Sequence, residues 1–324
     1  MRDAQNQSNN DVLRGDGMHR IQNILVATDY SEQARRAETR AAMLSVELKA
    51  STLEILAVQE TRMGLNTPAT ASESTECDVS SVDSVLVENR LPVSLAHSVD
   101  ALQCIRSLAV GKPATAIAKR ADELDSDLTI VAARSKKFVP AFFTRDGNDE
   151  LVRLSTRPVL LVHTDPDRAY AKVLVAVDFS EESKEAARHA LAVAPSAHFT
   201  FLHACQVPDE GIMRESGLNT EAMNASRMAL CEEARGELNL FIDQLGTRKQ
   251  LITRAIHYGQ TVSVLCDYAK RMRADLIAIG RHGKSRFVER LLGNTAQRLM
   301  DRTTCDLLVT STSPPGGWDD RPAA

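Results

Sequence analysis

Residues Ile24–Ser31 read ILVATDYS, and residues Leu174–Ser180 read LVAVDFS. Both stretches run from a short apolar segment into an aspartate and a serine, and Asp29 and Asp178 are separated by 149 positions. Short apolar runs are typical of buried strands, and a serine before an alanine-rich stretch is typical of a helix N-terminus. The motif predicts two copies of a unit that opens with a strand and a helix.

Further landmarks keep nearly the same spacing. Gly111 and Gly259 are 148 positions apart, and each stands shortly before a stretch with helical spacing of apolar residues. Each copy also closes with a short apolar run, PVLLV at Pro158–Val162 and DLLVT at Asp306–Thr310. An almost constant offset across these landmarks indicates a tandem duplication.

The second copy shows the alternation of elements most clearly. We expect strands over Lys172–Val177, Phe199–Cys205, Leu251–His257, Asp275–Ile279 and Asp306–Ser311. We expect helices from the N-cap Ser180 to about Val193, and over Glu221–Leu245, Val262–Arg273 and Thr295–Arg302. Strands that alternate with helices predict an α/β fold of two tandem open five-stranded parallel sheets, with helices on both faces.

The duplication also sets the predicted domain limits. We expect a disordered tail at residues 1–20, a first domain at 21–164, a linker at 165–170, a second domain at 171–312 and a disordered tail at 313–324. The first copy carries a Ser/Thr-rich segment at 61–84 where the second has its long helix, and low apolar content predicts a mobile loop there. Its composition suits a phosphorylation or docking site and equally an idle linker.

Composition excludes several classes of protein. The 324 residues carry a formal net charge of -4, and 4% of them are aromatic, so we expect no nucleic-acid partner. No stretch approaches about 18 consecutive apolar residues and the first residues form no apolar signal core, so we expect a cytoplasmic protein without a membrane segment. The six cysteines stand apart from one another, which favours free thiols over a metal site or a redox motif.

The strongest chemical signal is a set of glycines that follows the fourth predicted strand of the second copy. Gly280-Arg281-His282-Gly283 is followed after nine residues by Gly293-Asn294-Thr295, where the last helix begins. Glycines tolerate positive φ and close backbone approach, and successive main-chain N–H groups beside a helix N-terminus attract anions. Positive charge is added by Arg281, His282, Lys284, Arg286 and Arg290. The pattern indicates a site for a chain of phosphates, although glycines that merely turn the chain are the alternative.

On these residues the chain resembles the universal stress protein family over about residues 21–311. ATP-binding members carry G-x2-G-x9-G-[S/T], and the second copy reads G-R-H-G-(KSRFVERLL)-G-N, with Asn294 in place of the hydroxyl residue. An asparagine amide still donates to a phosphate oxygen. The resemblance implies an adenine-nucleotide-binding, Rossmann-like fold and ATP as the ligand, with Mg²⁺ held by phosphates and water.

The resemblance also implies which residues bind the nucleotide. The position of Asp178 lies at the base and ribose in nucleotide-binding relatives, although an aspartate there is equally suited to capping the helix. The implied binding residues are Ala176, Val177, Asp178, Ala204, Ile279, Gly280, His282, Gly283, Gly293, Asn294 and Thr295. No catalytic residue and no protein ligand for a metal is expected.

The first copy lacks the glycine signal. Ala133 and Lys136 stand where the glycines would be, so we expect no nucleotide to bind through this loop. Asp29 is retained, and we expect it to act as an acid at the start of a helix. Lys136 and Lys137 are expected to form a solvated basic edge.

These observations favour a non-enzymatic, ATP-binding stress-response module. A nucleotide-free adaptor is the alternative, and an ATP-hydrolysing or adenylating enzyme is disfavoured because neither VATDYS nor VAVDFS holds a glycine-rich loop and neither His282 nor Asp178 has a recognisable partner. Dimers of single-domain relatives pair an edge strand of each unit. We therefore expect the closing strands PVLLV and DLLVT to join the copies as an intramolecular pseudo-dimer, with a homodimer of whole chains left open.

Overall fold

The computed structural model describes residues 20–59, 102–133, 145–206, 220–246, 250–283 and 292–312. The predicted tails at 1–20 (apart from residue 20) and 313–324 and the predicted loop at 61–84 lie outside these ranges. So do Lys136 and Lys137 of the first copy, and Lys284, Arg286 and Arg290 of the second.

The N-terminal half contains the elements of one repeat. They are β1 (Asn23–Thr28), α2 (Glu32–Glu47), β2 (Thr52–Gln59), β3 (Gln103–Val110), α4 (Pro113–Glu123), β4 (Leu128–Ala132), α5 (Arg145–Leu154) and β5 (Val159–Val162).

The C-terminal half repeats the order with one additional long helix. Its elements are β6 (Lys172–Val177), α6 (Glu181–Val193), β7 (His198–Cys205), α8 (Thr220–Asp243), β8 (Leu251–Tyr258), α9 (Thr261–Met272), β9 (Leu276–Gly280), α10 (Asn294–Arg302) and β10 (Asp306–Thr310). Each element predicted for this copy is present, with bounds that differ by at most two residues.

The duplication extends to the turn that opens each half. After β1, Oδ1 of Asp29 accepts from the main-chain N–H of Ser31 at 3.0 Å, and after β6, Oδ1 of Asp178 accepts from that of Ser180 at 3.0 Å. The residue between them, Tyr30 or Phe179, has φ of 60° or 63°. Both serines then cap the following helix. An aspartate-anchored turn therefore starts each first helix.

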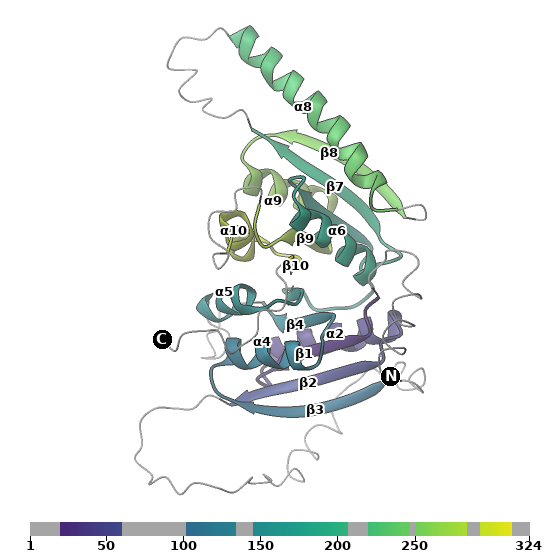
Figure 1. Cartoon of the computed structure of the whole chain (residues 1–324), viewed down its shortest axis with the longest axis vertical. Helices are drawn as coiled ribbons and strands as arrows, with labels where there is room; N and C mark the ends of the chain where they lie inside the picture. Colours follow the sequence, from purple (N-terminus) through teal and green to yellow (C-terminus); the bar gives the residue numbers. More distant parts are fainter. Residues whose placement is uncertain are drawn as a thin grey trace, which may run out of the picture.

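The strands of the described ranges form one continuous ten-stranded sheet in the order β3-β2-β1-β4-β5-β10-β9-β6-β7-β8, in which the two predicted five-stranded halves meet at β5 and β10 (Figure 1). Within each half the pairing is parallel, while β5 and β10 pair antiparallel, with Leu161 opposite Leu307 and Val159 opposite Val309. The predicted pairing of the closing strands is confirmed. It covers what would be an open edge of each half.

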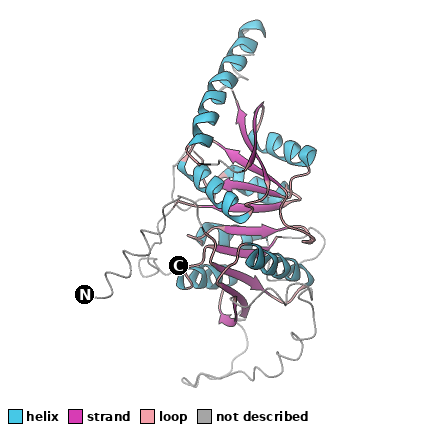
Figure 2. Ribbon diagram, turned by 90° about the vertical axis from the view of Figure 1, so that its right-hand side faces the viewer, coloured by secondary structure: helices cyan, strands magenta, loops and turns pink. Residues whose placement is uncertain are grey.

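Helices pack on both faces of the sheet (Figure 2). One buried apolar cluster joins the sheet to α2, α6 and α8 through Leu44, Leu191 and Phe241. The other joins the opposite face to α4, α5, α9 and α10, with Ile117 and Leu265 among its members. The three-layer α/β arrangement predicted from the alternation of strands and helices is confirmed.

A buried carboxylate holds the connection between the halves. Asp306, at the start of β10, is completely buried and accepts from the main-chain N–H groups of His163 at 2.9 Å and Thr164 at 3.1 Å. The hydroxyl of Tyr170 also donates to it at 2.6 Å, and the Arg40 guanidinium lies 3.4 Å away and over the Tyr170 ring. Burial raises the pKa of Tyr170 well above 10.0. Both ends of the connection are thereby fastened to β10.

The described ranges hold neither a membrane-spanning helix nor a cluster of metal-ligating side chains. No helix there is both long and apolar enough to cross a membrane. Within the same ranges, no group of three or more His, Cys, Asp or Glu side chains is placed to hold a metal ion.

Candidate functional site

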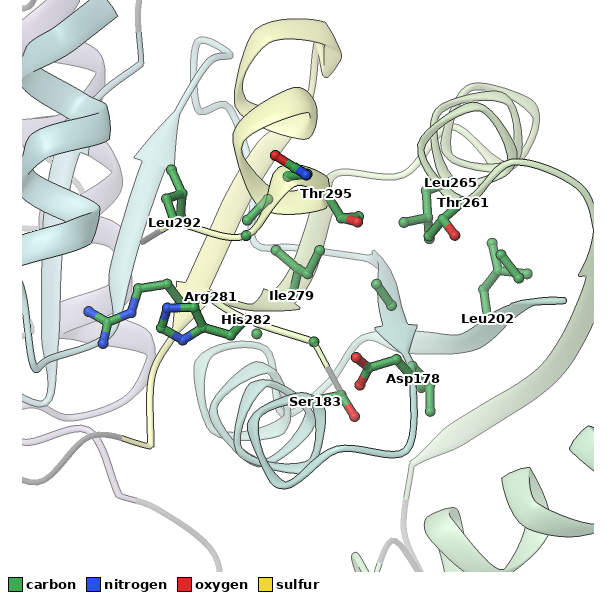
Figure 3. A pocket seen from close by; sticks show the side chains of 18 residues that line it. Asp178, Ser183, Leu202, Thr261, Leu265, Ile279, Arg281, His282, Leu292 and Thr295 are labelled. Carbon is green, nitrogen blue, oxygen red and sulfur yellow. The ribbon is translucent and has the colours of Figure 1, made fainter. Parts of the chain in front are cut away.

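A cavity of about 490 Å³ opens at the carboxyl ends of β6, β7 and β9, beside the N-termini of α9 and α10 (Figure 3). Ligands of open parallel sheets bind at this end of the strands. All eleven residues expected to bind a nucleotide line this one cavity. The structure thus brings together residues that are spread from Ala176 to Thr295 in the sequence.

Seven further residues line the cavity: Ser183, Leu202, Thr261, Leu265, Arg281, Leu292 and Ala296. The spacing of some of these residues along the sequence could have predicted that they line the cavity. Leu202 lies two positions before Ala204 on β7 and so faces the same side of the sheet. Thr261 and Leu265 are four positions apart at the start of α9, which places them on one helix face.

The cavity has two chemically different ends. Leu202, Thr261 and Leu265 gather at one end, and Thr295 with the N-terminus of α10 lies toward the other (Figure 3). Asp178 lies at the floor between β6 and Gly283. A ligand that carries both an apolar ring and an anionic group would suit this cavity, with the ring at the first end and the anion beside α10.

The N-terminus of α10 carries the free donors. Gly293 is the N-cap of this helix and supplies no side-chain cap, so the first-turn amides of Asn294, Thr295 and Ala296 lack the usual intrahelical and capping partners. These amides and the positive end of the helix dipole attract an anion. All three residues line the cavity.

Of the two properties that glycine offers, positive φ and close backbone approach, the three glycines of the site use close approach, because none of them has a positive φ. A Cβ on Gly280 would lie 2.8 Å from the Glu182 Cβ, and one on Gly293 would lie 2.8 Å from the Arg281 carbonyl oxygen. A Cβ on Gly283 would lie 2.8 Å from Oδ2 of Asp178. Each glycine therefore lets the loop lie directly against a neighbour.

Two of the main-chain amides expected in the anion site are already used. Arg281 N–H donates to the carbonyl of Thr310 at 2.7 Å, and His282 N–H donates to the carboxylate of Glu182. The expected run of free amides over Gly280-Arg281-His282-Gly283 is therefore wrong. The expected donors at the start of α10 do line the cavity.

Arg281 does not add its charge to the cavity as expected. Its side chain points away from Asp178 and Leu202 (Figure 3), and only 5% of the residue is exposed. The guanidinium donates to the carbonyls of Val152, Arg153 and Ser155 at 3.3, 3.1 and 2.9 Å. Burial lowers the pKa of Arg281. The loop is thus anchored to the N-terminal half.

His282 has a partner that no sequence pattern indicated. Its Nδ1 lies 3.0 Å from Oε1 of Glu182, a buried residue in the first turn of α6. The ring extends to the same side as Arg281, away from Asp178 (Figure 3). The pair therefore fastens the loop to α6, and the expectation that His282 lacks a partner is wrong.

Asp178 takes the helix-start role that the sequence left open, and it also lines the cavity. Its Oδ1 accepts from the N–H of Ser180 at 3.0 Å and from its hydroxyl at 2.5 Å, and Ser180 in turn caps α6. Its Oδ2 lies beside Gly283 at the cavity wall. One oxygen shapes the turn while the other faces the site.

Strand register corrects the comparison with the first half by one residue. Ile24 pairs with Leu128 as Val173 pairs with Leu276, so Ala132, and not Ala133, occupies the position of Gly280. The residue three positions further, like Lys136, lies outside the described ranges. The first half thus has the methyl group of Ala132 where the second half has Gly280, at which a Cβ would collide with Glu182.

Sequence comparison identifies the family. The sequence profile of the Universal stress protein family matches residues 20–163 and 169–311. A universal stress protein of Methanocaldococcus jannaschii is 26% identical over 146 residues, which are 44% of this chain and 83% of that protein. Universal stress protein E of Salmonella typhi is 24% identical over 194 residues, which are 56% of this chain and 60% of that protein.

Solved structures agree at the level of the fold. A universal stress protein from Archaeoglobus fulgidus superposes with a TM-score of 0.59 at 16% identity, covering 90% of this chain and 98% of that one. A protein of unknown function from Pseudomonas aeruginosa gives a TM-score of 0.58 at 20% identity, covering 90% and 92%. Because the family profile matches both repeats and most of the chain, the protein belongs to the universal stress protein family.

Proposed function

We propose that this protein is a non-enzymatic stress-response signalling module whose C-terminal half binds ATP. The observation that carries the proposal is the cavity of about 490 Å³ that joins apolar walls to the uncapped N-terminus of α10. Its volume lies in the range of about 300–1,000 Å³ that small-molecule sites occupy.

The residues of the cavity fit the parts of ATP. The first-turn amides of α10 and the Asn294 and Thr295 side chains would hold the phosphates, while Oδ2 of Asp178 would accept from a ribose hydroxyl. Apolar side chains of β6, β7 and α9 would cover the base. Any Mg²⁺ would be held by phosphates and water, as is usual for this ion.

Binding by the C-terminal half alone is supported by the position of Ala132. At the equivalent position the second half has Gly280, whose Cβ would meet Glu182. The non-enzymatic assignment is supported by the orientation of His282, whose bond to Glu182 directs it away from Asp178 (Figure 3).

We further propose that residues 21–164 and 171–312 act as an internal pair of domains joined by the linker 165–170. The antiparallel pairing of β5 and β10 supports this arrangement, because it joins the halves through buried strands. Association of whole chains into a homodimer remains a separate proposal, to be checked by analytical ultracentrifugation.

The proposal is tested by calorimetric titration of the full chain with ATP, ADP and GTP, together with identification of any nucleotide that co-purifies. ATP at 100 times its dissociation constant should stabilise the fold by about 2.7 kcal/mol. Gly293→Ala should weaken binding because its Cβ would meet the Arg281 carbonyl, whereas Gly236→Ala has open space and serves as control. Wild-type protein without affinity for ATP would leave the nucleotide-free adaptor, and turnover above background would support an enzyme.

A further inference from the structure

Helix α5 of the N-terminal half contacts two elements that border the C-terminal cavity, the loop after β9 and helix α10. Arg281, in the loop after β9, donates to carbonyls at the end of α5, and Gln297, on α10, donates to Asp149. We propose that α5 positions the anion-binding end of α10, with Arg281 as the positioning residue, so that nucleotide affinity of the C-terminal half depends on the N-terminal half. This inference rests on the proposed function.

The first contact is a buried charge with carbonyl partners. The acceptors of Arg281 are the carbonyls of Val152 and Arg153, in the last turn of α5, and of Ser155 just beyond it. Carbonyls at a helix C-terminus lack intrahelical donors and lie at the negative end of the dipole. Burying an arginine is costly unless such partners are present, so the guanidinium is tied to the end of α5.

The main chain of Arg281 carries this anchor to α10. Its N–H donates to the carbonyl of Thr310 on β10, and its carbonyl accepts from the N–H of Gly293 at 2.9 Å. Gly293 is the N-cap of α10, and a Cβ on it would lie 2.8 Å from that same carbonyl oxygen. A displacement of Arg281 therefore moves the first turn of α10, where the free amides are.

The second contact reaches the same turn from the side. Nε2 of Gln297 donates to Oδ2 of Asp149 at 3.1 Å, and Asp149 is buried on α5. The main-chain N–H of Gln297 donates to the carbonyl of Gly293 at 3.0 Å, which closes the first turn of α10. Helix α5 thus holds both the N-cap and the first turn.

The arrangement gives the N-terminal half, which lacks the glycines of the site, a role in nucleotide binding by the other half. Helix α5 occupies in the first repeat the place that α10 occupies in the second. Binding and coupling are reciprocal, so a ligand that orders the first turn of α10 must also stabilise the contacts with α5. The N-terminal half would then both shape the site and register whether it is filled.

The test compares full-length variants by ATP affinity and by amide hydrogen exchange. Arg281→Met keeps a long side chain without donors and should weaken ATP binding about tenfold, within the usual range of coupling between sites. Arg40→Met is the matched control: Arg40 is also buried at the junction, but it bonds to the carbonyl of Arg168 and lies against Asp306. Its affinity for ATP should stay within about twofold of wild type.

Hydrogen exchange provides the readout that a purely structural role would not move. ATP should slow amide exchange over residues 145–157 in wild type and in Arg40→Met, and should do so much less in Arg281→Met. Gln297→Ala, compared with Arg298→Ala at the exposed neighbouring position, tests the second contact if Arg281→Met fails to fold. We expect Gln297→Ala to weaken binding and to reduce the exchange response.

The outcomes separate the two proposals. Wild type that binds ATP without any change of exchange over 145–157, or with unchanged affinity in the folded Arg281 or Gln297 variants, overturns the inference and leaves the proposed function intact. Wild type without affinity for ATP overturns both.

Discussion

The buried Glu182 and the partly buried His282 form a pair that fastens the loop after β9 to the first turn of α6. The carboxylate accepts from the main-chain N–H of His282 and lies 3.0 Å from its Nδ1, across 100 positions of sequence. Gly280, the last residue of β9, has no side chain, and therefore the backbone of Glu182 can lie directly against this strand. The loop that borders the cavity is therefore held before any ligand arrives.

Removal of this carboxylate should destabilise the protein. Glu182→Gln removes the negative charge, so the bonds to the main-chain N–H and the ring of His282 lose the strength that a charged acceptor gives them. We expect the free energy of unfolding to fall by about 1–3 kcal/mol, measured by urea denaturation. Glu181→Gln, at a side chain that is 68% exposed, is the control and should change it little. Equal stability of the two variants would contradict the role of the pair.

The carboxylate of Asp178 should matter for ligand binding and the equivalent Asp29 should not. Asp178→Asn keeps an oxygen to accept from Ser180, but it removes the negative charge beside Gly283. A hydrogen bond to a charged group contributes about 1.5–3 kcal/mol, so ATP affinity should fall about tenfold or more. Asp29→Asn makes the same change in the first repeat. Calorimetry should find wild-type affinity there, and equal losses in both variants would show that the two halves bind alike.

Two glycine substitutions should have opposite effects on stability. Gly280→Ala places a Cβ 2.8 Å from the Glu182 Cβ and 2.9 Å from its carbonyl carbon, and such overpacking costs about 1–3 kcal/mol. Gly236→Ala lies within α8 with no atom within 4 Å of the new Cβ. Alanine in an exposed helix should stabilise by about 0.5–1 kcal/mol. Melting temperatures of the ligand-free proteins decide, and a Gly280→Ala protein as stable as wild type would refute the steric argument.

Tyr170 should make stability fall at alkaline pH. Its pKa is raised well above 10.0 in the folded protein, because the hydroxyl is buried and donates to Asp306. The folded state therefore holds this proton more tightly than the unfolded state. Its contribution is complete below about pH 10, the pKa of a free tyrosine, and is lost as pH rises above that value.

Tyr170→Phe isolates this effect. At pH 8 we expect the variant to be less stable by about 1–2 kcal/mol, because Asp306 loses one donor. The difference from wild type, followed by urea denaturation, should shrink as pH rises from 9 to 11. A difference that stays constant over this range would show that Tyr170 does not titrate with unfolding.

Much of the fold was present in local patterns. The repeat at Asp29 and Asp178 and the alternation of apolar strands with helices predicted the element order and the parallel sheets, while the family resemblance implied the pairing of the closing strands. The family resemblance implied the cavity residues as a set, and they meet in the fold because carboxyl ends of parallel strands lie at one edge of a sheet. Periodicity is a property of neighbours along the chain, so the sequence by itself determined these features.

Only the tertiary structure decided what the loop after β9 does. Local sequence placed Arg281 and His282 among the charges around a phosphate, whereas the fold directs them to the end of α5 and to Glu182. The strand register also showed that Ala132, and not Ala133, is the first-half residue equivalent to Gly280. The glycines are needed there because a Cβ would collide with neighbouring atoms. A helix or a strand repeats with a fixed number of residues, so the sequence shows which side chains share a face, but an irregular loop has no such repeat. Which donor meets which acceptor there depends on groups 100 or more positions away, and these become neighbours only once the sheet has formed.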